Sequence, residues 1–298
     1  MTSMPDLICS YFTLAGNLSP FDANTVSPIA FERRAQAAAA AGYKGFGFNT
    51  QDITHLLDTL GVREVNAILD ANGLVHRELE VLLNWFVDGE RRAASDQQRR
   101  QLLRAAEALG ARHIKIGGDI SGRTWPLEHV IEEFARLCDQ AAEVGTAITI
   151  ELFPTSNLAD LQTGRAVVEG AGRSNAGLLL DIWHMVRGHV RLDAIAALPG
   201  HLINHIELDD GPLLPRADYL TDTVDNRQAP GDGEFPCQAF LDAVASTGYR
   251  GLYGIEILSH AYRHMTPEEA ASASWNATAR VFENFRQRSA SAESHGGH

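Results

Sequence analysis

The chain has 298 residues, of which 45% are hydrophobic and 21% are charged, and its formal net charge is −13. This size and composition allow a large core, built either as two ordinary domains or as one α/β barrel. The acidic balance and the lack of any basic run argue against a protein that binds nucleic acid by neutralising phosphates.

Other classes of protein are disfavoured by simple sequence features. No apolar stretch approaches the roughly 20 residues needed to cross a bilayer, and the N-terminus has no basic-then-apolar signal pattern. We therefore expect a soluble, cytoplasmic protein without a membrane partner. The three cysteines, Cys9, Cys138 and Cys237, are far apart and show no CxxC spacing. They indicate neither a disulfide framework nor a thiolate zinc site.

Short β-branched or apolar runs recur along the chain and predict eight strands. In chain order these are Asp6 to Tyr11, Gly45 to Phe48, Val75 to Leu82, His113 to Ile116, Ala147 to Leu152, Gly177 to Asp181, Ile203 to Leu208 and Leu252 to Ile257.

Helix-period segments lie between these runs, and many of them end at a glycine. The predicted helices are Pro28 to Ala41, Val62 to Ala71, Asp96 to Leu109, Pro126 to Val144, Gly164 to Gly170, Asp193 to Ala197 and Cys237 to Ser246.

Alternating strands and helices predict a parallel sheet, and eight repeats over about 250 residues match the size of a (β/α)8 TIM barrel. We expect one such barrel over residues 1–286, because no change in composition marks a second domain. A doubly wound open sheet is the alternative, but the first strand is not followed by the GxGxxG turn that would indicate a nucleotide site. Residues 287–298 contain too few apolar residues to pack, so a disordered tail is expected there.

Four of the predicted strands carry an acid at or near their carboxyl end. Apolar neighbours take the helix-facing side of these strands, so the acids should point into the barrel. The four residues are Glu151, Asp181, Glu207 and Glu256. A single strand-end acid is commonly solvated or ion-paired, but four in register would otherwise need several cations. One shared divalent metal ion at the catalytic end of the barrel is the preferred interpretation.

Two further inward positions add polar groups to the same cavity. Lys115 should project inward from the fourth strand, where it neutralises part of the carboxylate cluster, binds a substrate oxygen or acts as a base, the neutralising role ranking first. Glu80, near the end of the third strand, is placed to hydrogen-bond a polar ligand. Trp85 follows, either as a wall for a sugar face or as an ordinary packed tryptophan.

The sequence Asp181-Ile182-Trp183-His184 sets an imidazole just beyond a strand-end carboxylate. Together with Glu151, His205-Ile206-Glu207, the turn Pro230-Gly231-Asp232-Gly233-Glu234-Phe235 and Gly248-Tyr249, it resembles the xylose isomerase-like TIM-barrel superfamily of sugar phosphate isomerases and epimerases. The resemblance runs from about residue 5 to residue 286.

The resemblance implies a single divalent ion, commonly manganese, magnesium, cobalt or zinc, held by side chains of strands five to eight. Glu151, Asp181 and Glu256 match three ligand positions. At the fourth, ketose 3-epimerases of this superfamily carry a metal-binding histidine where this chain has Glu207, while His205 matches an earlier histidine. An all-carboxylate set suits Mn²⁺ or Mg²⁺ better than Zn²⁺. If His205 is the ligand instead, the preference for an ion is open.

The segment from Asp209 to Glu234 is long for a loop, and such loops at the catalytic end often form lids or clamps. Arg227 within it resembles an arginine that precedes the glycine turn in relatives. It is either a substrate-binding residue or the partner in a loop-anchoring ion pair.

The leading hypothesis is an isomerase or epimerase that acts on a keto-sugar or polyol through a metal-stabilised enediolate, with Glu151 and Glu256 exchanging protons. The alternative is a dehydratase of the keto-inositol or dehydroshikimate type, with His184 or His205 as the acid. His184 and His205 are also candidates for substrate binding. A three-zinc endonuclease of the superfamily would need more inward histidines, and a barrel with a decayed site would not retain the acids. The substrate is expected to be a small sugar or polyol without phosphate, and a homo-oligomer is left open.

Overall fold

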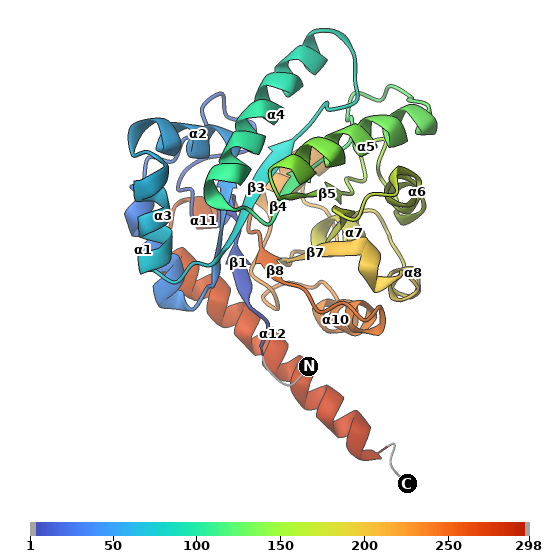
Figure 1. Ribbon diagram of the computed structural model, residues 1–298. Coiled ribbons are helices and arrows are strands. Elements are labelled where there is room, and N and C mark those ends of the chain that lie inside the picture. Colours follow the sequence, from blue (N-terminus) through green and yellow to red (C-terminus); the bar gives the residue numbers. More distant parts are fainter. Residues whose placement is uncertain (1–3, 296–298) are drawn as a thin grey trace.

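Eight parallel strands close into a barrel in the computed structural model, which describes residues 4–295 and the side chains of residues 4–288 (Figure 1). Each strand pairs with its sequence neighbours, and β8 pairs with β1. The strands are β1 (Leu7–Cys9), β2 (Gly45–Asn49), β3 (His76–Leu82), β4 (His113–Ile116), β5 (Ala147–Glu151), β6 (Ala176–Asp181), β7 (Ile203–Leu208) and β8 (Tyr253–Ile255). The predicted eight strands and the TIM barrel are confirmed, and the open-sheet alternative is excluded.

Helices surround the barrel and cover its outer surface (Figure 1). They are α1 (Phe31–Ala41), α2 (Thr50–Thr59), α3 (Val62–Ala71), α4 (Gly89–Leu109), α5 (Leu127–Glu143), α6 (Leu161–Ala171), α7 (Ile182–Arg187), α8 (Leu192–Ala196), α9 (Tyr219–Asp225), α10 (Cys237–Ser246), α11 (His260–Arg263) and α12 (Pro267–His295). The sequence pattern did not predict α2, α7, α9, α11 or α12. Three of these, α7, α9 and α11, have four to seven residues, which is too short for a helical period to emerge.

The alternation of side chains along the strands separates the core from the barrel interior. Ile148 and Ile150 of β5 pack in the hydrophobic layer between the sheet and the helices, whereas Glu151 points into the barrel. Burial of the apolar layer holds the strands in this register, since a slip of one residue would turn the apolar set inward. The predicted inward positions of the four acids follow directly from this constraint.

Helix α12 runs beside α1 and projects past the lower end of the barrel in the view of Figure 1. It reaches His295, so most of the segment 287–298, whose composition predicts a disordered tail, is helical in the structure. Alanine, glutamine, arginine and glutamate are good helix formers, which allows a helix to continue after its last packed residue. Residues 296–298 lie outside the described residues.

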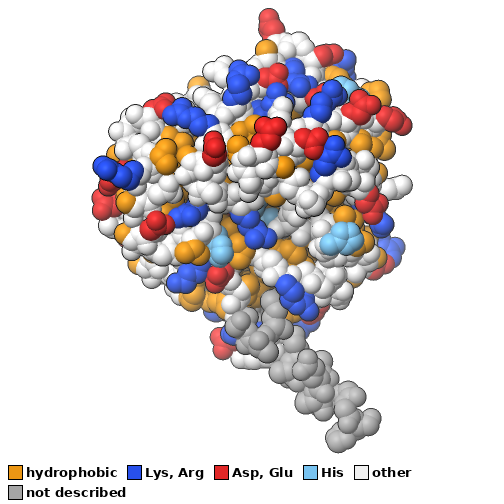
Figure 2. Space-filling view, viewed as in Figure 1, with side chains coloured by type: hydrophobic (Ala, Val, Ile, Leu, Met, Phe, Trp, Pro, Cys, Tyr) orange, Lys and Arg blue, Asp and Glu red, His pale blue; other side chains and the backbone are white. Residues whose placement is uncertain are grey.

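The surface and the thiols carry few functional signals. All three cysteines are free and buried, and within residues 4–295 no helix combines the length and apolar character needed to cross a bilayer. Figure 2 shows acidic and basic side chains interspersed over the described part of the visible face.

A buried ion pair joins α1 and α2 to the loop that follows β1. Nη2 of Arg34 lies 2.9 Å from Oδ2 of Asp52, and both side chains are only 1% exposed. Oδ1 of Asp52 also accepts a hydrogen bond from the backbone N–H of Ser27. This pair therefore anchors the segment that carries Phe12 and Phe21 to the mouth of the barrel.

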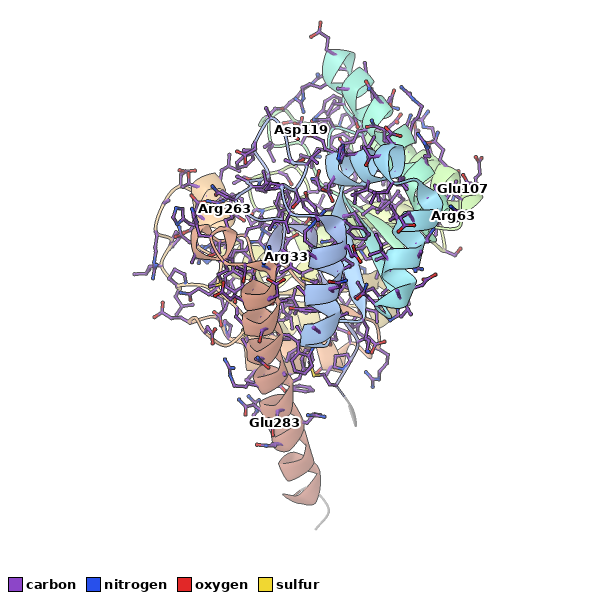
Figure 3. The ribbon with its side chains drawn as sticks, turned by 90° about the vertical axis from the view of Figure 1, so that its left-hand side faces the viewer. Arg33, Arg63, Glu107, Asp119, Arg263 and Glu283 are labelled. Atoms are coloured by element: carbon purple, nitrogen blue, oxygen red, sulfur yellow. The ribbon has the colours of Figure 1, made fainter. Side chains whose placement is uncertain are left out.

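We expect Asp52→Asn to lower the free energy of unfolding by roughly 3 kcal/mol, because Arg34 would keep its charge without its counter-ion in a dry site. Denaturant unfolding monitored by circular dichroism measures the change. The matched control is Glu268→Gln, which breaks an exposed pair between Arg33 of α1 (Figure 3) and α12 and should cost less than about 1 kcal/mol. If the two variants lower the free energy of unfolding equally, the stabilising role of the buried Arg34–Asp52 pair is contradicted.

Candidate active site at the carboxyl ends of the strands

Four carboxylates from consecutive strands meet inside the barrel. Glu151 and Asp181 end β5 and β6, Glu207 lies near the end of β7, and Glu256 follows β8. Asp181 stands opposite Glu207 in the sheet register. All four side chains are buried, and each offers an oxygen that lies within 4.8 Å of the others. The predicted cluster of inward acids is therefore present.

Two permanent cations lie against this cluster. Nζ of Lys115 contacts a carboxylate oxygen of Glu207 and lies 2.8 Å from Glu80 and 3.5 Å from Glu256. Nη1 of Arg227 lies 2.8 Å from Asp181 and 3.1 Å from Glu256. Lys115 thus neutralises several acids at once, as expected for a lysine that points into the barrel from the fourth strand.

The acids still outnumber these cations, and their proton affinities reflect it. Burial raises the pKa of Glu80 to about 8 and also raises the pKa of Glu151. Burial and the neighbouring acid Glu256 together raise the pKa of Glu207 well above its usual value. Burial thus favours the protonated form of Glu80, Glu151 and Glu207, and a bound dication would favour the ionised form instead.

His184 stands beside Glu151 on the wall of the cavity. Its Nε2 lies 3.0 Å from Oε1 of Glu151, and its Nδ1 lies 2.6 Å from the hydroxyl of Tyr219. Phe153 packs against the imidazole ring edge to face. These contacts fix the ring so that Nε2 faces the carboxylate cluster, which makes His184 a group through which a proton can reach Glu151.

The long loop after β7 places Arg227 in the site. Helix α9 forms within this loop, and the backbone N–H of Arg227 then donates to the carbonyl of Leu258 after β8. A second carboxylate, Asp209, lies 2.7 Å from Nη1 of Arg227. Arg227 is thereby an anchored residue whose guanidinium has several acidic partners.

The Pro-Gly-Asp-Gly turn has a structural role next to this loop. Asp210 accepts hydrogen bonds from the backbone N–H groups of Gly211, Gly231 and Phe235. A Cβ at Gly233 would lie 2.3 Å from Oδ1 of Asp210, so only glycine permits this close approach. The turn therefore fixes the end of the loop that carries Arg227.

A cavity opens above the carboxylates at the mouth of the barrel. Glu80, Glu151, His184, Arg227 and Glu256 form its polar floor and wall. Its remaining lining is mostly apolar and includes Phe12, Phe21, Val81, Leu83, Ile120, Phe153, Leu220, Val224 and Leu258. The arrangement accommodates a ligand with a polar end on the acids and a less polar body against the aromatic wall.

Not every predicted residue reaches the cavity. Lys115 and Glu207 are buried beneath its floor, and His205 lies one layer deeper, because it precedes Glu207 by two residues on the same strand. His205 contacts Glu78 instead of the four-carboxylate cluster. Glu207, and not His205, therefore groups with Glu151, Asp181 and Glu256 in the structure. Trp85 is a packed residue whose Nε1 donates to the carbonyl of Gly117.

Three residues of this region were not singled out from the sequence. Asp209 and Tyr219 lie on the loop after β7, where no periodic pattern defines the direction of a side chain. His113 begins β4 and has the same parity as Lys115, so the alternation of the strand was a sufficient signal for its inward direction.

The four acids fit a hard divalent cation. They provide only oxygen donors, and Oε2 of Glu207 is buried without a hydrogen-bond partner among the described residues. Carboxylate-rich sites are typical of Mn²⁺ and Mg²⁺.

Comparison with known proteins gives the same architecture. The family model described as xylose isomerase-like TIM barrel matches residues 35–281, so the chain belongs to this family. A solved structure, that of the IolI protein with a bound zinc atom, superposes with a TM-score of 0.82 at 18% identity, covering 95% of this chain and 99% of that one.

Two curated relatives are enzymes. A 3-dehydroshikimate dehydratase of Pseudomonas aeruginosa is 30% identical over 133 residues, which are 44% of this chain and 21% of the relative. An inosose isomerase of Bacillus velezensis is 22% identical over 197 residues, which are 64% of this chain and 69% of the relative. The matched part of the chain thus spans about a fifth of the first relative and about two thirds of the second.

Manganese is expected to raise the unfolding temperature of the protein, because an ion that binds only the folded state stabilises it. At a free ion concentration of 100 times the Kd, the free energy of unfolding increases by about 2.7 kcal/mol. Asp181→Asn should remove most of this increase, since it takes one charge and one donor from the cluster. Thermal unfolding with and without MnCl₂ measures both effects. The control is Asp193→Asn, on the exposed start of α8, and manganese should stabilise this variant as much as the wild type. If manganese stabilises Asp181→Asn equally well, the four-carboxylate metal site is contradicted.

Proposed function

We propose that the protein is a divalent-metal-dependent isomerase or epimerase that acts on a keto-sugar or polyol. The observation that carries the proposal is the position of Glu151 and Glu256, which both belong to the four-carboxylate cluster and both line the cavity. Two such carboxylates can exchange protons with the same bound substrate. The inosose isomerase similarity supports a reaction of this class.

Glu151, Asp181, Glu207 and Glu256 would hold the ion. When bound, the ion would polarise the ketone carbonyl and acidify the adjacent C–H group, giving an enediolate. The oxygen donors favour Mn²⁺ or Mg²⁺, with Co²⁺ or Zn²⁺ as further candidates.

The two glutamates differ in their partners, which suits them to different halves of the reaction. Glu256 lies beside Arg227 and takes the proton from carbon. Glu151, whose pKa burial raises, delivers a proton to the opposite face, and His184 with Tyr219 replaces it. One proton leaves the substrate and one returns, so the configuration at that carbon is inverted without net change in composition.

The cavity lining also limits the substrate. Among the described residues that line it, Arg227 is the one cationic side chain, and its guanidinium already contacts Asp181, Asp209 and Glu256. A phosphate group would find no free cation there. We infer that the substrate is an unphosphorylated keto-polyol that rests its carbon skeleton on Phe153 and its neighbours.

A dehydratase is the second candidate, and His184 is the observation that favours it. An imidazole fixed on the cavity wall with a tyrosine hydroxyl behind it can protonate a β-hydroxyl as it leaves. The similarity to a 3-dehydroshikimate dehydratase supports this reaction. It shares the first proton abstraction with the isomerase and differs in losing water.

The test is incubation of the manganese-loaded protein in D₂O with unphosphorylated ketoses, keto-inositols and dehydroshikimate. We expect deuterium to enter next to the carbonyl and a second sugar to form, as followed by NMR. A conjugated product with ultraviolet absorption would instead establish the dehydratase. Neither exchange nor product with any of these compounds would reject both reactions.

Glu151→Gln and Glu256→Gln should each lower the rate of interconversion at least about 100-fold, the usual contribution of a positioned acid or base. Each variant keeps one of the two carboxylates, so it should still exchange deuterium into one epimer but not into the other. The epimer that exchanges should differ between the two variants. Glu107→Gln, on the exposed face of α4 (Figure 3), is the control. Equal exchange of both epimers by both variants would contradict the assignment of two bases.

A further inference from the structure

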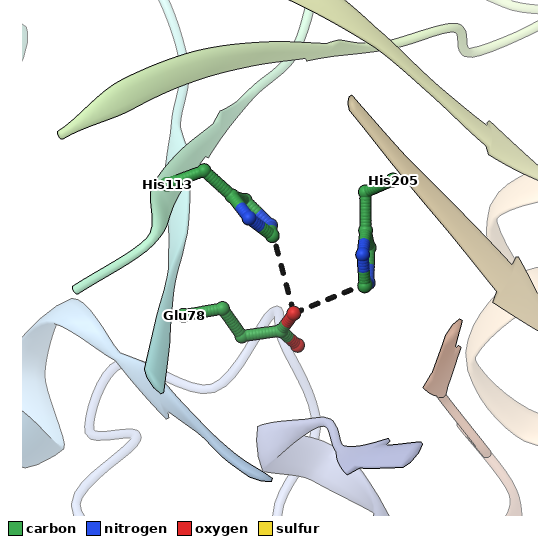
Figure 4. A group of neighbouring side chains, drawn as sticks. All are labelled: Glu78, His113 and His205. Carbon is green, nitrogen blue, oxygen red and sulfur yellow. Dashed lines mark ion pairs between the residues drawn. The ribbon is translucent and has the colours of Figure 1, made fainter. Parts of the chain in front are cut away.

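A second group of metal-binding side chains lies beneath the four carboxylates. Strands β3, β4 and β7 each direct two residues inward, two positions apart, and the upper three are Glu80, Lys115 and Glu207. The lower three are Glu78, His113 and His205. Figure 4 shows the two imidazoles converging on the carboxylate of Glu78.

The distances within this lower group match those between ligands of one metal ion. Oε2 of Glu78 lies 3.2 Å from Nε2 of His205 and 3.5 Å from Nε2 of His113. Around a tetrahedral zinc ion with bonds of about 2.0 to 2.1 Å, neighbouring ligand atoms are about 3.4 Å apart. All three ligand atoms lie within 4.8 Å of one another.

The same atoms lack other partners. Oε2 of Glu78 and both ring nitrogens of His113 and of His205 have no well-formed hydrogen bond among the described residues, although the three residues are at most 1% exposed. Buried polar atoms without a partner are costly and rare. The other oxygen of Glu78 is well satisfied, since Oε1 accepts from Ser10 at 2.9 Å and lies 3.3 Å from Nζ of Lys115.

The surroundings favour the ligand form of each side chain. Burial lowers the pKa of His113 and of His205, so both imidazoles are neutral at physiological pH. Glycine at position 254 leaves room for His205, because a Cβ there would lie 2.7 Å from Nε2 of this histidine.

We propose that Glu78, His113 and His205 form a second metal site, selective for zinc, inside the barrel and distinct from the four-carboxylate cluster. Two imidazoles and one carboxylate suit Zn²⁺, whereas four carboxylates suit a harder ion. Because the lower site is closed to solvent, its zinc exchanges slowly. The inference does not rest on the proposed reaction.

The experiment measures metal content of the full chain, without an affinity tag, produced with zinc and manganese in the medium. After dialysis of the folded protein against EDTA, we expect manganese to be lost and about one zinc per chain to remain, released only on denaturation. X-ray absorption at the zinc edge should show two imidazole ligands. Zinc bound through oxygen alone, or no retained zinc, would overturn the proposal.

Variants separate the two sites. His205→Gln and His113→Gln should lower retained zinc at least tenfold and leave manganese binding in place. Asp181→Asn should weaken manganese binding and leave the retained zinc in place. The exposed His201→Gln is the matched control and should retain zinc. Loss of zinc with Asp181→Asn but not with His205→Gln would place zinc in the upper cluster and refute the lower site. If the histidine variants do not fold, the absorption spectrum of the wild type decides.

Discussion

Carboxylates outnumber permanent cations inside this barrel. Each buried carboxylate needs a bound proton, a hydrogen-bond donor or a neighbouring cation, because an uncompensated buried charge costs several kcal/mol. Lys115 and Arg227 meet this need from two sides. Lys115 stands on β4 below the cluster, and Arg227 enters from the loop after β7. Beside these two cations, burial still raises the pKa of Glu80, Glu151 and Glu207. The four-carboxylate cluster is therefore a candidate site for a dication.

The same constraint organises the fold around the site. Strands supply the acids at fixed heights because their apolar residues are held in the layer beneath the helices. The loops supply the rest of the cavity lining, including Tyr219, Arg227 and the aromatic wall.

The sequence predicts the rigid part well. Alternation in Ile148-Thr149-Ile150-Glu151 and in His205-Ile206-Glu207 was enough to place the acids inside, since a strand allows two directions and core burial selects one. The alternation did not decide whether His205 or Glu207 groups with the other three acids, because both residues point inward. That choice depends on the height of each residue relative to Asp181, which the pairing register sets and no local pattern encodes.

Residues on loops and very short helices were harder to predict for the same reason. Tyr219 begins a seven-residue helix whose position depends on bonds between Arg227 and the segment after β8. The continuation of α12 was missed because helix propensity alone can extend a helix that packing has started.

Gly254 links the two layers of the barrel. Its missing side chain leaves room for both His205 and Glu207, which reach across from the neighbouring strand. A larger residue at position 254 would collide with His205 and Glu207 unless these positions of β7 carried shorter side chains. The identities of these three positions are thus mutually dependent, and a relative that has replaced the glycine should also have changed the polar groups that it accommodates.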